Sequence, residues 1–199
     1  MDNIFFVTSI WMIPVLTAII FHKIIQSWIA LILGDDTACK AIAITSNPLK
    51  QLDMFGTFLL PFALILVSNG KMMFGYGKSL PLNSENFKRP QVYSTIVSMS
   101  GPIANFIMAV AWALLSHLLP EIDGAMGTWL THTIYNGIWI NCLLFVFNLI
   151  PIPPLDCGKA ISILAPQSIK TRFLELERVG TLVVLTTFFI VPIAGKVVD

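Results

Sequence analysis

Three side chains near the end of the first apolar run could take part in chemistry: His22, Lys23 and Gln26. Their spacing is that of the helical zinc-binding motif His-Glu-x-x-His, whose two histidines lie on one helical face and whose glutamate is a general base. Here Lys23 stands at the position of the base and Gln26 at the position of the second imidazole. The motif keeps one imidazole and has lost its base and one metal ligand.

A carboxylate much further along the chain is the second candidate. Asp156 comes directly after the segment 148–155, which contains three prolines. Prolines lack an N–H and clash with the preceding turn, so a helix does not continue through them. In hydrocarbon, such a broken backbone survives only where protein or a water-lined cavity satisfies its free carbonyls. An ionisable group at membrane depth is a functional candidate.

The composition indicates what kind of elements position these groups. Of the 199 residues, 56% are hydrophobic and only 12% are charged, about half the charged fraction of an ordinary soluble domain. This composition predicts an integral membrane protein, a single domain over 1–199 that is surrounded by the lipid bilayer. The net charge of +1 gives no indication of a nucleic-acid partner.

Apolar runs mark the expected helices. They cover residues 4–33, 54–68, 93–119, 133–152 and 179–198. About 20 apolar residues are needed to cross the hydrocarbon core as a helix, and only 54–68, which contains Pro61, is too short. We therefore expect an all-α polytopic membrane protein with four or five transmembrane helices. Between the first two runs, the alternating stretch 38–45 predicts a small strand or hairpin insertion.

Basic residues predict the orientation in the membrane. The loop 69–92 and the segment 157–178 each carry four Lys or Arg residues, whereas the loop 120–132 carries none. Cytoplasmic loops are enriched in Lys and Arg. The first two segments are therefore expected in the cytoplasm and 120–132 on the opposite side. If 54–68 does not cross completely, Lys40 and Lys50 also lie on the cytoplasmic side, and the excess of basic residues on that side becomes larger.

Several motifs together carry a family resemblance. The segment 148–158 is similar to the pattern Asn-x-x-Pro-x-Pro-x-x-Asp-Gly, with Cys157 where glycine is common. The segment 101–105 is similar to Gly-Pro-x-x-Asn. Further similar blocks, in matching order, are 28–38, 47–57 and 75–87. Over about 15–165, the chain resembles the site-2-type intramembrane zinc metalloproteases, particularly their small bacterial branch.

This resemblance implies site residues, a cofactor and a location. It places zinc ligands at His22, Gln26 and Asp156, the general base at Lys23, and a contact to the substrate carbonyl at Asn105. It implies zinc as the cofactor and a transmembrane protein as substrate or partner. It also implies the inner membrane of a bacterial cell as the location.

The two departures from the family motif change the expected chemistry. An ammonium has no acceptor and its charge repels a dication, so Lys23 cannot activate a metal-bound water. The Gln26 carbonyl is a poor zinc ligand beside imidazole. We therefore expect weak or absent zinc binding and a catalytically impaired pseudoprotease that keeps the fold and binds a membrane partner or substrate. In this hypothesis the Lys23 ammonium replaces the zinc charge and pairs with Asp156, and the other polar side chains of the site complete the network.

Other interpretations of the same residues stay open. One is an active intramembrane zinc metalloendopeptidase with an unusual ligand set. Another, from a different class of protein, is a small-solute or ion pathway built around the broken fourth run. In the plainest interpretation, His22 is an interfacial histidine, Lys23 extends its ammonium to the membrane surface, and Gln26 bonds to a neighbouring helix.

Overall fold

The computed structural model describes residues 4–45, 59–68, 73, 75, 80–120 and 122–166. Within these residues, every element of regular structure is a helix. The long helices are α1 (Ile4–Ile32), α4 (Pro90–Leu118) and α5 (Gly124–Asn148). The short ones are α2 (Thr37–Thr45), α3 (Leu60–Ser68), the 3₁₀ turn η3 (Ser84–Asn86) and α6 (Asp156–Leu164). The all-α prediction is thus confirmed for the described part of the chain.

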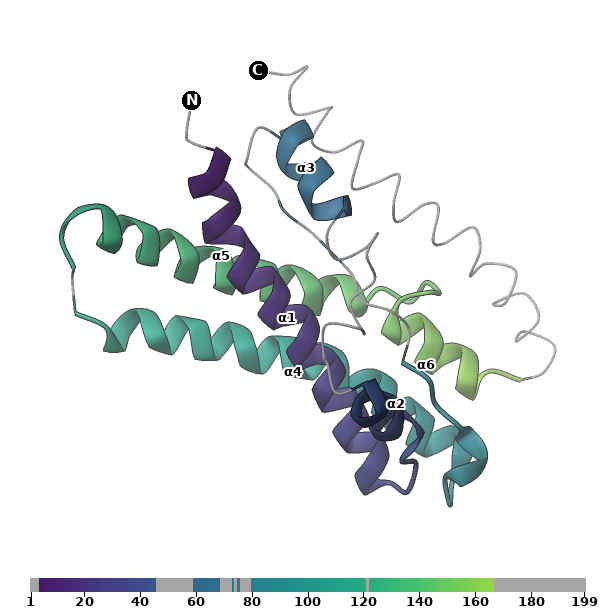
Figure 1. The fold of residues 1–199 in the computed structure, drawn as a ribbon. Helices are drawn as coiled ribbons and strands as arrows, with labels where there is room; N and C mark the ends of the chain where they lie inside the picture. Colours follow the sequence, from purple (N-terminus) through teal and green to yellow (C-terminus); the bar gives the residue numbers. More distant parts are fainter. Residues whose placement is uncertain are drawn as a thin grey trace.

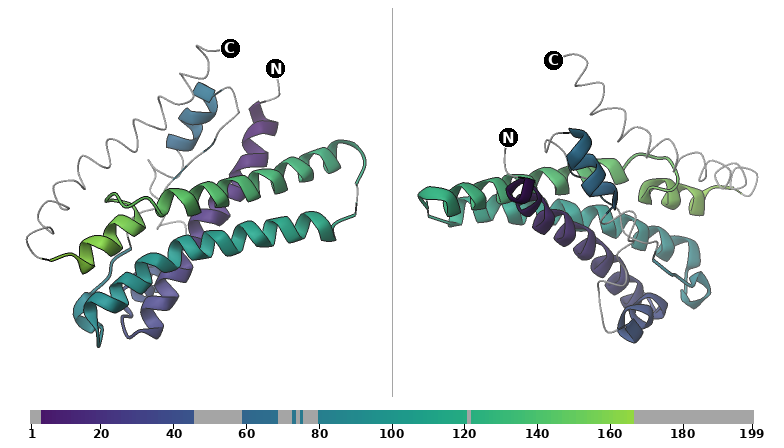
Figure 2. Two further views of the ribbon diagram at one scale, coloured as in Figure 1. Left: turned by 180° about the vertical axis from the view of Figure 1, so that it is seen from behind. Right: turned by 45° about the horizontal axis from the view of Figure 1, so that its top comes forward.

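The three long helices form the frame that holds the candidate site. Helices α4 and α5 lie antiparallel and side by side, and α1 crosses both of them (Figures 1 and 2). Helix α6 packs on α4, at the end of the bundle where α4 begins (Figure 1). Apolar side chains of α1, α3 and α5 form the main core, in which Val15, Leu64 and Ile140 are almost completely buried.

Among the described residues, three helices are long and apolar enough to cross a membrane: α1, α4 and α5. They indicate an integral membrane protein. The prediction of four or five spans is not supported. The described part of the run 54–68 is α3, whose nine residues extend about 13 Å at 1.5 Å per residue, less than half of the hydrocarbon core. The predicted span 179–198 lies outside the described residues.

The predicted strand or hairpin at 38–45 is wrong, because this stretch is helix α2. Asp35 Oδ1 accepts a hydrogen bond from Thr37 N at 3.1 Å, which satisfies one of the free N–H groups at the start of the helix. Lys40 N donates to Asp36 O at 2.8 Å, and the two side chains form an ion pair one turn apart. The alternation of apolar and polar residues over 38–45 fits a strand, but the hydrogen bonds of Asp35 and Asp36 at the start of the segment favour a helix.

A proline inside α1 is compensated by a neighbouring helix. Pro14 lacks the N–H that would otherwise bond the carbonyl of Ile10. Asn136 of α5 donates its Nδ2 to this carbonyl at 3.3 Å. Because a free carbonyl is costly in an apolar interior, this amide stabilises the crossing of α1 and α5.

One buried carboxylate connects the end of α1 to the loop before α4. Asp35 is fully buried. Its oxygens accept hydrogen bonds from Thr37 (N, 3.1 Å, and Oγ1, 2.5 Å), Asn83 (N, 2.9 Å) and Asn86 (Nδ2, 2.8 Å). Burial raises the pKa of Asp35, but these hydrogen bonds together outweigh burial, and the pKa lies below its ordinary value of 3.8.

The bonds of Asp35 bring the end of α1 and the start of α4 to one end of the bundle. Helix α6 lies at this end as well, and the end of α4 and the start of α5 lie at the other (Figure 1). The exposed Lys88 and Arg89 at the start of α4 are thus at the same end as the first residues of the basic segment 157–178. The side of the membrane on which this end lies stays a prediction.

We expect Asp35→Asn to lower the free energy of unfolding by about 2 kcal/mol or more, because its new amide donor faces other donors in a buried site. Since the folded pKa lies below 3.8, the stabilisation by Asp35 is complete at neutral pH and is lost as pH falls through the folded pKa. Thermal unfolding in detergent at neutral and at acidic pH measures both effects.

The control for this prediction is Asp36→Asn. The ion pair of Asp36 with Lys40 is largely exposed, at 46% and 68% of the two side chains, and such surface pairs contribute about 0–1 kcal/mol. Equal losses of stability in the Asp35 and Asp36 variants at neutral pH would contradict the proposed connection.

Candidate functional site

A buried histidine and a buried carboxylate meet at the junction of α1 and α6. His22 Nε2 lies 3.0 Å from Asp156 Oδ2, and each side chain is only 8% exposed. Asp156 is the first residue of α6, where free backbone N–H groups favour a carboxylate. The turn that brings it there needs Gly158, because a Cβ at that position would overlap the backbone of Ile152. The sequence prediction that His22 and Asp156 share a site agrees with this geometry.

The other ring nitrogen of His22 is held by α4 and α5. His22 Nδ1 lies 2.6 Å from Asn105 Oδ1. Asn105 Nδ2 donates to Asn141 Oδ1 at 3.1 Å and to Ala18 O at 3.4 Å. Asn141 Nδ2 in turn donates to Gly137 O at 2.8 Å. Both asparagines are fully buried. This chain of amides connects α1, α4 and α5 on the Nδ1 side of His22.

The directions of these bonds determine what His22 can do. A backbone carbonyl only accepts hydrogen bonds, so Asn141 and Asn105 direct their NH₂ groups toward Gly137 O and Ala18 O. This orientation leaves Asn105 Oδ1 facing His22. Nδ1 must therefore carry a hydrogen. Nε2 then faces the carboxylate of Asp156, whose Oδ2 lies close to Nε2 but has no aligned hydrogen bond within the described residues. The Nε2 lone pair then opposes the carboxylate, and a hydrogen on Nε2, a protonated Asp156 carboxyl or a cation that both atoms contact would relieve this opposition.

The two altered motif positions bond to each other. Lys23 Nζ donates to Gln26 Oε1 at 3.2 Å. Gln26 Nε2 donates to Ser98 O at 3.3 Å. Pro102 of α4 lacks the N–H that would otherwise bond this carbonyl, so Gln26 compensates a proline of α4 as Asn136 does in α1. Both ends of the Gln26 amide are therefore occupied.

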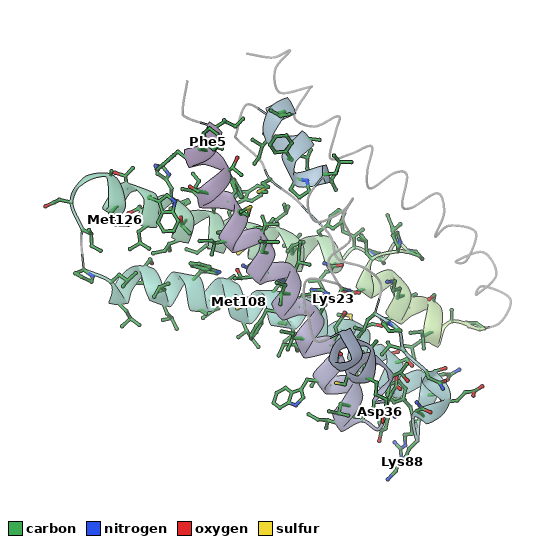
Figure 3. The ribbon with its side chains drawn as sticks, viewed as in Figure 1. Phe5, Lys23, Asp36, Lys88, Met108 and Met126 are labelled. Carbon is green, nitrogen blue, oxygen red and sulfur yellow. The ribbon has the colours of Figure 1, made fainter. Side chains whose placement is uncertain are left out.

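The predicted ion pair of Lys23 with Asp156 is not formed at contact distance, although the opposite charges of the two side chains attract each other across the site. Among the described residues, the ion pair of Asp156 is with His22, and Lys23 has no carboxylate within 4.0 Å. The physical reason is local. Gln26 lies one turn further along the same helix, and its Oε1 accepts the hydrogen bond of the Lys23 ammonium, which therefore stays on α1. Lys23 also lies within the bundle, away from the exposed end where Asp36 and Lys88 project (Figure 3).

A glycine allows α1 and α4 to approach at this point. Gly101 is buried, and a Cβ built on it would lie 2.6 Å from Gln26 Nε2 and closer still to His22 Nε2. Real Cβ atoms do not make such contacts, so the side chains of α1 occupy the space that Gly101 leaves open. Gly101 thus determines how deeply the altered motif sits against α4.

The donor set does not fit a catalytic zinc centre. Such centres use three protein ligands and keep a further position open. Within the described part of the chain, His22 and Asp156 are the two residues of the site that offer suitable atoms, because Gln26 Oε1 is bonded to an ammonium, whose charge opposes a dication. Among the described residues, no three His, Cys, Asp or Glu side chains gather in one place.

Asn105 is close to the site but fully engaged. Its oxygen faces His22, and its nitrogen donates to two acceptors. The expectation that Asn105 contacts a substrate carbonyl stays a prediction. The sequence motifs and the family resemblance indicated five residues of the site but not Asn141; the five are His22, Lys23, Gln26, Asn105 and Asp156. The signal that was available is an amide inside the apolar run 133–152, where a polar group needs a partner.

The fold and the site define the class of protein first: an integral membrane protein with a histidine–carboxylate pair buried between its helices. The chain is 34% identical over 189 residues to a protein of Bacillus subtilis (strain 168) named "Putative zinc metalloprotease YwhC". The alignment covers 93% of this chain and 82% of that protein. The chain therefore belongs to the metalloprotease family of that protein. No protein-family model matches the chain, and no solved structure matches it.

Proposed function

We propose that this chain is a site-2-type membrane protein whose zinc site has become a polar network, and that it binds a transmembrane partner or substrate without cleaving it. The family, named for a zinc metalloprotease, supports the protease ancestry. The altered motif at His22, Lys23 and Gln26 supports the loss of hydrolysis. Under this proposal the fold is kept for binding.

The observation that carries the proposal is the hydrogen bond from Lys23 Nζ to Gln26 Oε1 at 3.2 Å. These two residues stand where the family has its general base and its second imidazole. In their present pairing they offer neither an acceptor for a proton of water nor a free ligand atom. The bond of Gln26 to Ser98 O adds a structural role that a metal ligand at this position would not have.

The proposed location follows from the same arguments. We place the chain in the inner membrane of a bacterial cell, with 69–92 and 157–178 in the cytoplasm. Each of these segments carries four Lys or Arg residues. Of their described parts, the start of α4 and helix α6 lie at one end of the bundle (Figure 1), as this orientation requires, whereas Met73 packs in the main core.

One observation favours a second candidate, an active zinc metalloendopeptidase with an unusual ligand set. His22 Nε2 and Asp156 Oδ2 lie 3.0 Å apart. The hydrogen bond of Nδ1 to Asn105 leaves Nε2 as the ligating nitrogen, an arrangement typical of zinc-bound histidines. Under this alternative, a substrate or water would complete the ligand set.

Zinc loading and cleavage, measured together, distinguish the two candidates. The full chain is purified in detergent, incubated with zinc, freed of excess metal, and analysed for zinc per chain. It is also mixed with a transmembrane reporter peptide. We expect substoichiometric zinc and no cleavage above that of the variant His22→Ala. About one zinc per chain, together with cleavage that His22→Ala abolishes, would overturn the proposal and establish the second candidate.

A further inference from the structure

We propose that Asn141 is a positioning residue of the site. Acting through Asn105, it keeps a hydrogen on Nδ1 of His22 and directs Nε2 toward Asp156. Asn141 itself does not touch His22, because the contact runs through Asn105. The proposal rests on the proposed function in one respect: it assumes that Nε2 of His22, which faces Asp156, is the atom that bound zinc in the ancestral site.

The argument begins at the far end of the amide chain. Gly137 O accepts a hydrogen bond from Asn141 Nδ2 at 2.8 Å. Because a carbonyl has no hydrogen to donate, Asn141 cannot turn its amide around without placing its own oxygen against that of Gly137. Its Oδ1 is therefore held toward Asn105, where it accepts a hydrogen bond from Nδ2 at 3.1 Å.

The orientation of Asn141 determines that of Asn105. If the Asn105 amide turned around, its oxygen would face both Asn141 Oδ1 and Ala18 O, which now accept from Nδ2. Both asparagines are fully buried, so no water could bond the opposed oxygens. Buried polar groups without partners are strongly disfavoured. Asn105 Oδ1 therefore stays on His22 Nδ1.

The two tautomers of His22 would otherwise favour the opposite arrangement. A neutral imidazole beside Asp156 gains most by placing its hydrogen on Nε2, where it could donate to the carboxylate 3.0 Å away. The hydrogen on Nδ1 is thus imposed by α5 against a local preference. Without Asn141 Oδ1, only Ala18 O, at 3.4 Å, opposes a turned Asn105 amide.

The test uses Asn141→Leu, which removes the acceptor and keeps a side chain of similar size. Histidine labelled with ¹⁵N is incorporated into the full chain in detergent. The signals of His22 are identified by their absence in His22→Ala, and Nδ1 and Nε2 are distinguished by their couplings to the two ring C–H hydrogens. At alkaline pH, the ¹⁵N shift separates a nitrogen that carries hydrogen from one that does not. We expect Nδ1 to carry hydrogen in the unaltered chain and to lose it in most molecules of Asn141→Leu.

Two further variants separate positioning from general damage. Asn136→Leu removes an amide of the same helix that bonds α1 at Ile10 O but is not part of the chain to His22, so Nδ1 should keep its hydrogen. Asn141→Asp, when protonated, can donate to Gly137 O as the amide does and keeps an oxygen that accepts from Asn105, so it should restore the unaltered signature.

Three results would overturn the proposal: an Nδ1 without hydrogen in the unaltered chain, the same His22 shifts in Asn141→Leu as in the unaltered chain, or an equal change in Asn136→Leu. The first needs no variant of Asn141, so the test stands even if Asn141→Leu does not fold. The ring shifts depend neither on zinc nor on cleavage. An active, zinc-loaded chain would therefore overturn the proposed function and leave the positioning role to be decided by the shifts.

Discussion

Replacing Lys23 by Glu and Gln26 by His in the same chain is expected to create a protein that binds about one zinc per chain and cleaves a transmembrane reporter. The introduced imidazole supplies the missing third ligand beside His22 and Asp156, and the introduced carboxylate supplies an acceptor for a proton of water. The retained pair is already in position, with its atoms 3.0 Å apart. Metal analysis and reporter cleavage measure the result.

The single substitutions are expected to behave differently from the double one, because Lys23 and Gln26 bond to each other. In Lys23→Glu, a carboxylate faces Gln26 Oε1 and two acceptors oppose each other. In Gln26→His, the ammonium of Lys23 loses its partner and stays next to the metal ligands. A double-mutant cycle on thermal unfolding should give a coupling of about 1 kcal/mol or more.

The control for the restored site is the same double variant with Asp156→Asn. Without the carboxylate, zinc binding and cleavage should both disappear, because the amide is a weak ligand for zinc. If the double variant folds and binds no zinc, then the scaffold no longer holds the geometry of a protease, and the loss of activity extends beyond positions 23 and 26.

Gly101→Ala is expected to lower the free energy of unfolding, because its added methyl group would overlap the side chains of the altered motif. The new Cβ would lie 2.6 Å from Gln26 Nε2 and closer still to His22 Nε2, so α1 and α4 must separate or both side chains must leave their places. Overpacking of this kind costs about 1–3 kcal/mol, and the loss of the Gln26 bond to Ser98 O leaves a buried carbonyl unpaired, at about 1–3 kcal/mol more. Thermal unfolding measures the sum.

A matched control for Gly101→Ala is Ala111→Ser, which also adds one heavy atom to α4 but on an exposed face. Its effect should stay within about 0.5 kcal/mol. In the double variant Lys23→Glu with Gln26→His, adding Gly101→Ala should also abolish zinc binding, whereas adding Ala111→Ser should not. Similar effects of the two substitutions would show that α1 and α4 tolerate a wider separation than the contacts of Gly101 imply.

The long helices could be predicted closely where apolar length alone defines them. The run 4–33 corresponds to α1 (Ile4–Ile32) and the run 93–119 to α4 (Pro90–Leu118). The run 133–152 begins nine residues after the start of α5 (Gly124–Asn148) and ends four residues beyond its end. The first two turns of α5 contain threonines and a tryptophan, which lower the apolar average without ending a helix. The pattern over 38–45 did not indicate helix α2, because its alternating residues satisfy a strand pattern as well.

The candidate site could be predicted only in part from the sequence. Spacing along one helix is a local property, so the sequence by itself determined that His22, Lys23 and Gln26 share a stretch of α1 and that the motif has lost its base and one ligand. The broken segment before Asp156 likewise marked a carboxylate at the end of an apolar run. These features need no knowledge of how the helices pack.

Only the tertiary structure decided which of these groups pair. Lys23 and Asp156 have opposite charges and suggested an ion pair, but His22 reaches the carboxylate and Gln26 bonds the ammonium. The choice depends on the approach of α6 and α4 to α1, which Gly101 permits. The role of Asn141 depends on α5 in the same way. Hydrogen bonds between helices act over about 3 Å, so they follow from the relative positions of whole elements and not from spacing along any one of them.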